Sequence, residues 1–148
     1  MRTKYFENAE GLEQLLNDYK EIFEMVDDFG QQLIQGVSNT PDDYKKMLNQ
    51  LTGAFITLEP LYTQAEAKKL NEELNAYVSM KRELEAKGEK VVAASLEKES
   101  SLAVADFRRI RAILEGYVEA CAKAIGTVQS QLKRLEFEYK NKNSQINE

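Results

Sequence analysis

Apolar residues recur every three or four positions through the last third of the chain. The repeat starts at Phe107 and ends at Tyr139, and no proline interrupts it. This period places the apolar side chains on one face of an α-helix. The pattern predicts one helix over residues 91–140, roughly 75 Å long, which needs partner helices to cover its stripe. Residues 141–148 show no period and are expected to fray. The stripe consists of Phe107, Ile110, Leu114, Tyr117, Cys121, Ile125, Val128, Leu132, Leu135 and Tyr139.

Two similar stripes precede the long one. The first predicts a helix over residues 8–37, whose apolar residues alternate in steps of four and three, as in a heptad repeat, with one gap at Gly30. Its members are Leu12, Leu16, Tyr19, Phe23, Val26, Leu33 and Val37. The second stripe predicts a helix over residues 41–87. Thr40 is expected to cap its start, Pro41 suits its first turn, and Gly88 marks its end.

Pro60 lies inside the second predicted helix. A proline within a helix removes one hydrogen bond and costs about 3 kcal/mol. Two alternatives follow: a helix that kinks at Pro60, or a helix pair that stops near Thr57 and restarts at Pro60. The apolar period continues across Pro60.

The three predicted helices define the fold class. We expect an all-α protein, an elongated, coiled-coil-like helical bundle with a very long C-terminal helix, formed as a single helical domain over residues 1–148. Charged residues make up 30% and hydrophobic residues 43% of the chain, with only two prolines, as in helix-rich soluble proteins. No apolar run approaches the roughly 20 residues of a membrane span, and no signal-peptide pattern opens the sequence. The expected compartment is the cytoplasm.

Small residues four apart form a ridge on the long helix. Such a ridge lets a second helix approach closely. We therefore interpret the ridge, with the neighbouring apolar positions, as a surface for helix packing or oligomerisation. The alternative is that Gly116 and Gly126 are tolerated surface glycines, each costing about 1 kcal/mol. The residues of this predicted surface are Ala112, Gly116, Ala120, Cys121, Ala124, Ile125 and Val128.

The sequence contains no recognisable catalytic site. Histidine, the commonest general base and metal ligand, is absent. There is no glycine-rich phosphate loop, nucleophile elbow or calcium loop. Cys121 lies in the apolar register, which favours a buried thiol over a nucleophile. We expect a protein that is not an enzyme and that has no cofactor and no metal site.

Clusters of basic residues are the one functional signal. Net charge is −5, but residues 1–60 carry five basic and eleven acidic side chains, whereas residues 61–148 carry fifteen and fourteen. Spaced cations suit the phosphates of nucleic acid. The alternative is an ordinary solvated helix surface, because glutamates are interleaved with the cations. The candidate nucleic-acid contacts are Lys81, Arg82, Lys87, Lys90, Arg108, Arg109 and Arg111.

Residues 51–140 resemble the phage recombination mediators of the UvsY type. The resemblance rests on a basic segment at residues 77–82, the glycine turn at Gly88, and a long terminal helix with the sequence LKRLE at residues 132–136. It implies a homo-oligomer that binds single-stranded DNA and loads a recombinase onto DNA covered by a single-strand-binding protein. It also implies that Lys81 and Arg82 contact DNA.

The acidic first helix departs from the family pattern. It leaves open a rival interpretation, in which the chain is a structural or adaptor bundle that binds only proteins, for example a phage virion or assembly component.

Overall fold

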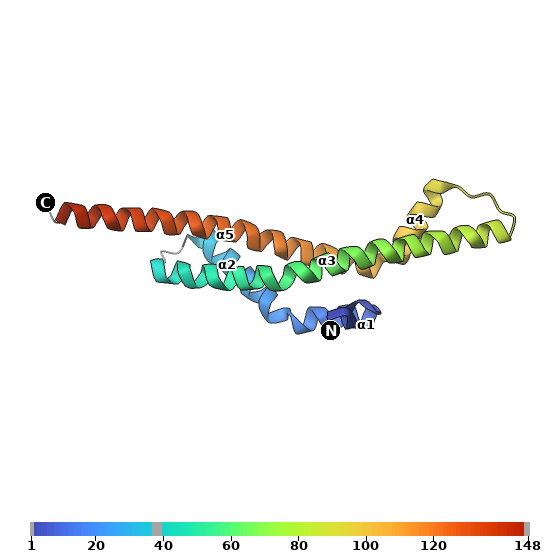
Figure 1. Ribbon diagram of the computed structural model, residues 1–148, viewed down its shortest axis with the longest axis horizontal. Helices are drawn as coiled ribbons and strands as arrows, with labels where there is room; N and C mark the ends of the chain where they lie inside the picture. The colour runs from blue at the N-terminus through green and yellow to red at the C-terminus, as the bar shows by residue number, and fades with distance from the viewer. Residues whose placement is uncertain (1, 37–39, 147–148) are drawn as a thin grey trace. The chain divides into compact units, whose positions relative to one another are not determined.

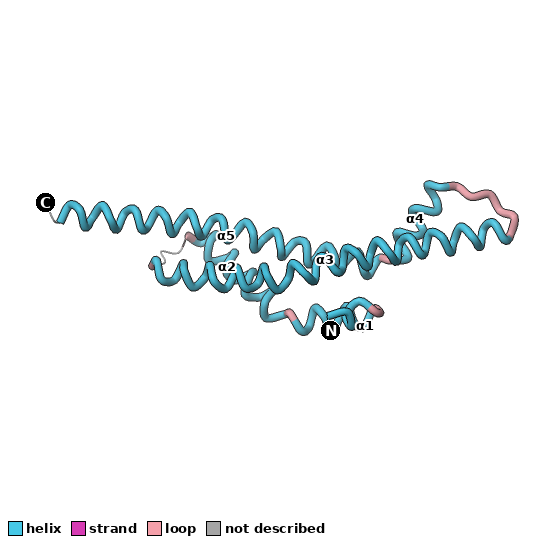
Figure 2. The backbone as a smooth tube through the Cα atoms, in the orientation of Figure 1, coloured by secondary structure: helices cyan, strands magenta, loops and turns pink. Residues whose placement is uncertain are grey.

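Helices form nearly all of the described chain. The computed structural model describes residues 2–36 and 40–146, and in these residues it contains α-helices and one 3-10 helix but no strand. The predicted all-α class is confirmed (Figures 1 and 2). The elements are η1 (Arg2–Phe6), α1 (Ala9–Asp18), α2 (Lys20–Gln35), α3 (Pro41–Ala86), α4 (Ala93–Ala103) and α5 (Ala105–Ile146).

The chain divides into two compact units, each of which is described by itself. The first unit combines Met1–Asp18 with Pro60–Glu115, and the second combines Tyr19–Glu59 with Gly116–Glu148. Both long helices contribute to both units, because α3 passes from the second unit to the first at Pro60 and α5 passes from the first to the second at Gly116. Each unit is therefore built from segments far apart in sequence.

The predicted helix over residues 8–37 is two helices, separated at Tyr19. Tyr19 has φ −104° and ψ 9°, outside helical geometry. Leu12 and Leu15 of α1 are buried in the first unit, whereas Phe23 of α2 is buried in the second. The heptad pattern did not reveal this division because the apolar spacing continues across it. Gly36, at φ +65°, ends α2 in the left-handed conformation, and Val37 lies outside the described residues.

Helix α3 runs unbroken across Pro60, so the alternative of a helix pair broken near Thr57 is wrong. Its predicted cap is present: the Thr40 hydroxyl accepts the Asp43 amide at 3.2 Å, and the Asp43 carboxylate accepts the Thr40 amide at 3.1 Å. Its C-terminus is closed by Gly88 at φ +68°, whose amide donates to the Glu85 carbonyl. This arrangement is the Schellman motif that the glycine predicts.

The predicted helix over residues 91–140 is divided at Val104 and extends beyond its predicted end. Buried residues step by four from Leu96 to Ser100 to Val104, and then by six to Ile110. A step of six moves to another face of a straight helix. The break at Val104 therefore lets both α4 and α5 bury their apolar residues. At the other end, α5 continues through the predicted frayed tail to Ile146, and residues 147–148 lie outside the described part.

In the second unit, the α5 stripe packs on α2 and α3. One core cluster joins Tyr44, Met47 and Leu51 of α3 to Val128, and another joins Val26 and Ala54 to Cys121. Burying an apolar side chain of this size contributes roughly 1.5–3 kcal/mol. This part of the stripe therefore finds its partner helices within one chain.

Buried residues of the first unit come from every element that crosses it. They are Tyr5, Phe6, Leu12, Leu15, Leu61, Ala65, Leu96, Ser100, Val104, Ile110 and Leu114. Across the described residues, no helix combines the length and apolar character that crossing a membrane would require.

Candidate nucleic-acid interface

All seven predicted nucleic-acid contacts lie in the first unit, in two groups. Lys81 and Arg82 lie near the C-terminus of α3, and Lys87 and Lys90 lie in the loop before α4; we call these four the α3-end cations. The remaining three are arginines in the first two turns of α5.

The α3-end cations are exposed and have no carboxylate partner in the described part of the chain. All four side chains are solvent-exposed, and among the described residues no ion pair involves any of them. The Schellman turn at Gly88 fixes the backbone between Lys87 and Lys90. Residues 81–90 hold three glutamates against these four cations, so the segment is only weakly basic. Any binding by this segment must come from local contacts to phosphates rather than from a large positive field.

Arg111 is occupied by carboxylates within the chain. Its guanidinium donates to Glu66 of α3 and pairs with Glu115 at 3.0 Å, and it lies 5.7 Å from the centroid of the Tyr62 ring. The hydrogen bond from Arg111 lowers the pKa of Glu66 and raises the pKa of Arg111. Arg111 therefore acts first as a link between α3 and α5.

The other two arginines of α5 differ from each other. Arg109 pairs with Glu13, which joins α5 to α1 in the first unit. Arg108 is exposed, and the described residues offer it no ion pair. Of the three arginines predicted to contact DNA, only Arg108 lacks a carboxylate partner among the described residues. These pairs leave no signal in the local sequence because they join residues 96 and 45 positions apart.

A pocket lies beside these arginines, where α4 ends and α5 begins. Its volume is about 430 Å³. Two of its polar residues, Lys69 of α3 and Ser101 of α4, were not identified from the sequence. Their distance along the chain from the arginines leaves no spacing signal that would have revealed them. The lining residues are Lys69, Ser101, Leu102, Ala105, Arg108, Arg109, Arg111 and Ala112.

Some residues of the predicted packing surface on α5 are buried, and others are exposed. Cys121 and Val128 are fully buried, while Ile125 and Ala124 are partly buried against the second-unit core. Burial raises the pKa of the Cys121 thiol, so the thiolate is disfavoured. The rest of the ridge, at Ala112, Gly116 and Ala120, is exposed.

The expected close contact at Gly116 is absent within the described chain. A Cβ added at Gly116 would meet nothing within 4 Å, and the same is true at Gly126. The small ridge predicts close approach only where a second helix lies on it, and at Gly116 no described part of this chain does so. Within one chain, both glycines are therefore tolerated surface residues.

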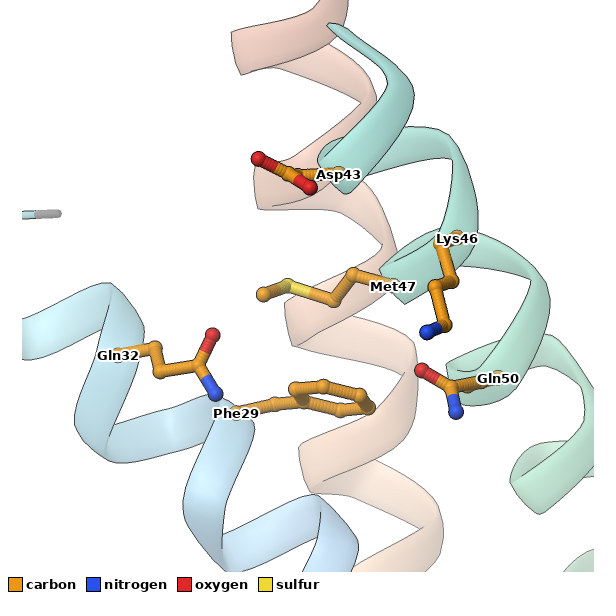
Figure 3. A pocket seen from close by; sticks show the side chains of 6 residues that line it. All are labelled: Phe29, Gln32, Asp43, Lys46, Met47 and Gln50. Carbon is orange, nitrogen blue, oxygen red and sulfur yellow. The ribbon is translucent and has the colours of Figure 1, made fainter. Parts of the chain in front are cut away.

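A second pocket lies in the second unit, between α2 and the start of α3 (Figure 3). Its volume is about 290 Å³, and its two charged residues, Asp43 and Lys46, have opposite signs. Asp43 already caps α3 through the Thr40 amide. The charged residues that line this pocket sum to zero net charge. Among the described residues, no group of three potential acidic, thiol or imidazole ligands is placed to hold a metal ion.

Comparison with protein-family models, with curated proteins and with solved structures found no match to this chain.

Proposed function

We propose that this protein is a non-enzymatic, homo-oligomeric accessory protein that binds single-stranded DNA in phage-type recombination and helps to load a recombinase. The observation that carries the DNA-binding proposal is that the α3-end cations are exposed and form no ion pair among the described residues. The recombination role, with a recombinase and a single-strand-binding protein as partners, rests on the resemblance of residues 51–140 to the UvsY-type mediators.

The chemistry at the end of α3 suits an unpaired strand. Lysine and arginine contact backbone phosphates, while aromatic rings stack on exposed bases. Tyr77 is half-buried and lies four residues before Lys81, so the two side chains share one face of α3. Stacking tolerates any base, so we expect binding with little sequence preference.

A salt titration with a fluorescent deoxythymidine oligonucleotide tests the proposal. Each phosphate contact to a single strand contributes about −0.7 to the slope of log affinity against log salt, so four contacts predict a slope of about −3. Such a slope weakens binding about fifty-fold between 50 and 200 mM salt. Failure of the intact protein to bind the oligonucleotide even at 50 mM salt would reject the proposal.

A second candidate function is a scaffold that binds only proteins. It is favoured by an exposed apolar stripe on α3, formed by Leu70, Leu74 and Val78, which are 53%, 62% and 37% exposed. These residues are four apart and share one helix face. An apolar stripe in water favours association with another protein surface.

Sedimentation with and without the change of Leu70 and Leu74 to Glu separates the two functions. The scaffold function predicts that this double variant loses self-association while the protein shows no affinity for the oligonucleotide. If the double variant dissociates but still binds DNA, the result would instead favour the DNA-binding function over the scaffold function.

A further inference from the structure

The pocket between α4 and α5 has cations as its only charged lining residues. Lys69, Arg108, Arg109 and Arg111 contribute to its wall, and no carboxylate does. This is unusual in a net acidic chain, because the first unit as a whole carries twelve basic and fourteen acidic residues. The feature is a local concentration of hydrogen-bond donors around an open surface pocket.

The backbone explains how these side chains come together. The break at Val104 redirects the chain between α4 and α5, and the Arg108 amide begins the α5 ladder by donating to the Val104 carbonyl at 3.0 Å. Ser101, in the last turn of α4, and Arg108, in the first turn of α5, therefore line the same pocket. Lys69 completes the wall from α3.

The four cations are neutralised to different degrees. Arg111 and Lys69 both contact Glu66, the lysine at 3.8 Å, and Arg109 contacts Glu13. Each guanidinium has five N–H donors, so a paired arginine can still donate to a ligand. Arg108 has no carboxylate partner among the described residues.

We infer that this pocket binds a phosphate group, with Arg108 as its principal charge partner and with Lys69, Arg111 and the Ser101 hydroxyl as further donors. Phosphate oxygens accept several charge-assisted hydrogen bonds from guanidinium groups at once. A volume of about 430 Å³ lies in the range of small-molecule sites, so the pocket has room for a diphosphate or for the phosphate of a DNA strand. This inference does not depend on the proposed function, because a protein scaffold could equally hold a phosphate here.

Glu13 competes with the ligand for Arg109. The carboxylate lies on α1, pairs with Arg109 and is 60% exposed. Removing its charge frees Arg109 and leaves the pocket one unit more positive. The change Glu13→Gln should therefore tighten phosphate binding several-fold, whereas loss of a lining cation should weaken it.

Calorimetric titration of the full chain with inorganic pyrophosphate at low salt tests the inference. We expect Arg108→Gln to weaken binding about tenfold or more, because a hydrogen bond to a charged group is lost. The matched control is Lys98→Gln, which removes an exposed cation of α4 that does not line the pocket, and it should leave affinity unchanged. Melting curves establish that the variants are folded.

The inference is overturned if pyrophosphate does not bind the intact chain, or if Arg108→Gln and Lys98→Gln have equal effects. Competition with a deoxythymidine decamer then identifies the source of the phosphate. Displacement of pyrophosphate by the decamer supports a strand phosphate, and binding of both together supports a free diphosphate. Because the α3-end cations are intact in these variants, failure at the pocket and failure of DNA binding are distinguishable.

Discussion

Arg111 links helices more than it presents charge to solvent. Its partners Glu66 and Glu115 come from α3 and α5, and its own side chain is 28% exposed. Replacing it with Met leaves Lys69, at 3.8 Å, as the one cation that pairs with Glu66 among the described residues. We expect Arg111→Met to lower the free energy of unfolding by about 1 kcal/mol, measured by urea denaturation.

Arg108→Met provides the matched control for that change. It removes the same charge three residues earlier on the same helix, at an exposed position without an ion pair among the described residues. A surface change of this kind alters stability by less than about 0.5 kcal/mol. Equal destabilisation by the two variants would show that the Arg111 contacts contribute nothing to folding.

The Glu66 pair also predicts a pH dependence. Hydrogen bonding from Arg111 lowers the pKa of Glu66 below its ordinary value of 4.5 in the folded state. The stabilisation is therefore fully present above pH 4.5 and is lost as the pH falls through the lower, folded-state pKa. Urea unfolding of the intact chain and of Glu66→Gln should differ at pH 7 and converge in strongly acidic solution. A difference that stays constant from pH 7 to pH 3 would argue against this linkage.

At the scale of elements, the glycine that ends α3 and the glycine within α5 have opposite effects on stability. Gly88 adopts φ +68° in the turn after α3, where a side chain is strained, whereas Gly116 is helical and has open space around its Cβ position. We expect Gly88→Ala to destabilise by about 1 kcal/mol and Gly116→Ala to stabilise by about 0.5–1 kcal/mol. Thermal melting measures both. Destabilisation by Gly116→Ala would indicate that another helix packs closely on this ridge.

Helix ends that have their own capping residues could be predicted from the sequence, whereas breaks set by packing could not. Thr40 and Gly88 were expected to bound α3 and do so. The breaks at Tyr19 and Val104 involve neither glycine nor proline, and they follow from which unit or face buries the flanking residues. Pro60 shows the opposite behaviour. A proline favours a break in a helix, but α3 continues through this position.

The candidate site was predictable only where the residues are neighbours in sequence. The α3-end cations lie within ten residues and are exposed as expected. The pairing of Arg109 with Glu13 depends on how helices meet, and the local pattern contains no trace of it. The same holds for Lys69 as a lining residue of the pocket beside Arg108.

At the scale of the whole molecule, charge argues against unspecific attraction to DNA. The net charge is −5, and in each of the two units acidic residues outnumber basic residues. Long-range attraction of a polyanion is therefore weak, and affinity depends on short-range contacts made by cations without carboxylate partners. This restricts the proposed function to a small set of residues and makes it open to a direct test.

The most direct measurement compares two variants that each lose four positive charges. One replaces the α3-end cations with Ala, and the other replaces Lys123, Lys133, Lys140 and Lys142, exposed lysines of the second unit. Anisotropy of a fluorescent deoxythymidine oligonucleotide at 50 mM salt gives the affinity of each. We predict that the first variant loses binding, while the second keeps most of its affinity and a salt slope of about −3. Equal losses in both variants, or full binding by the first, would contradict an interface at the end of α3.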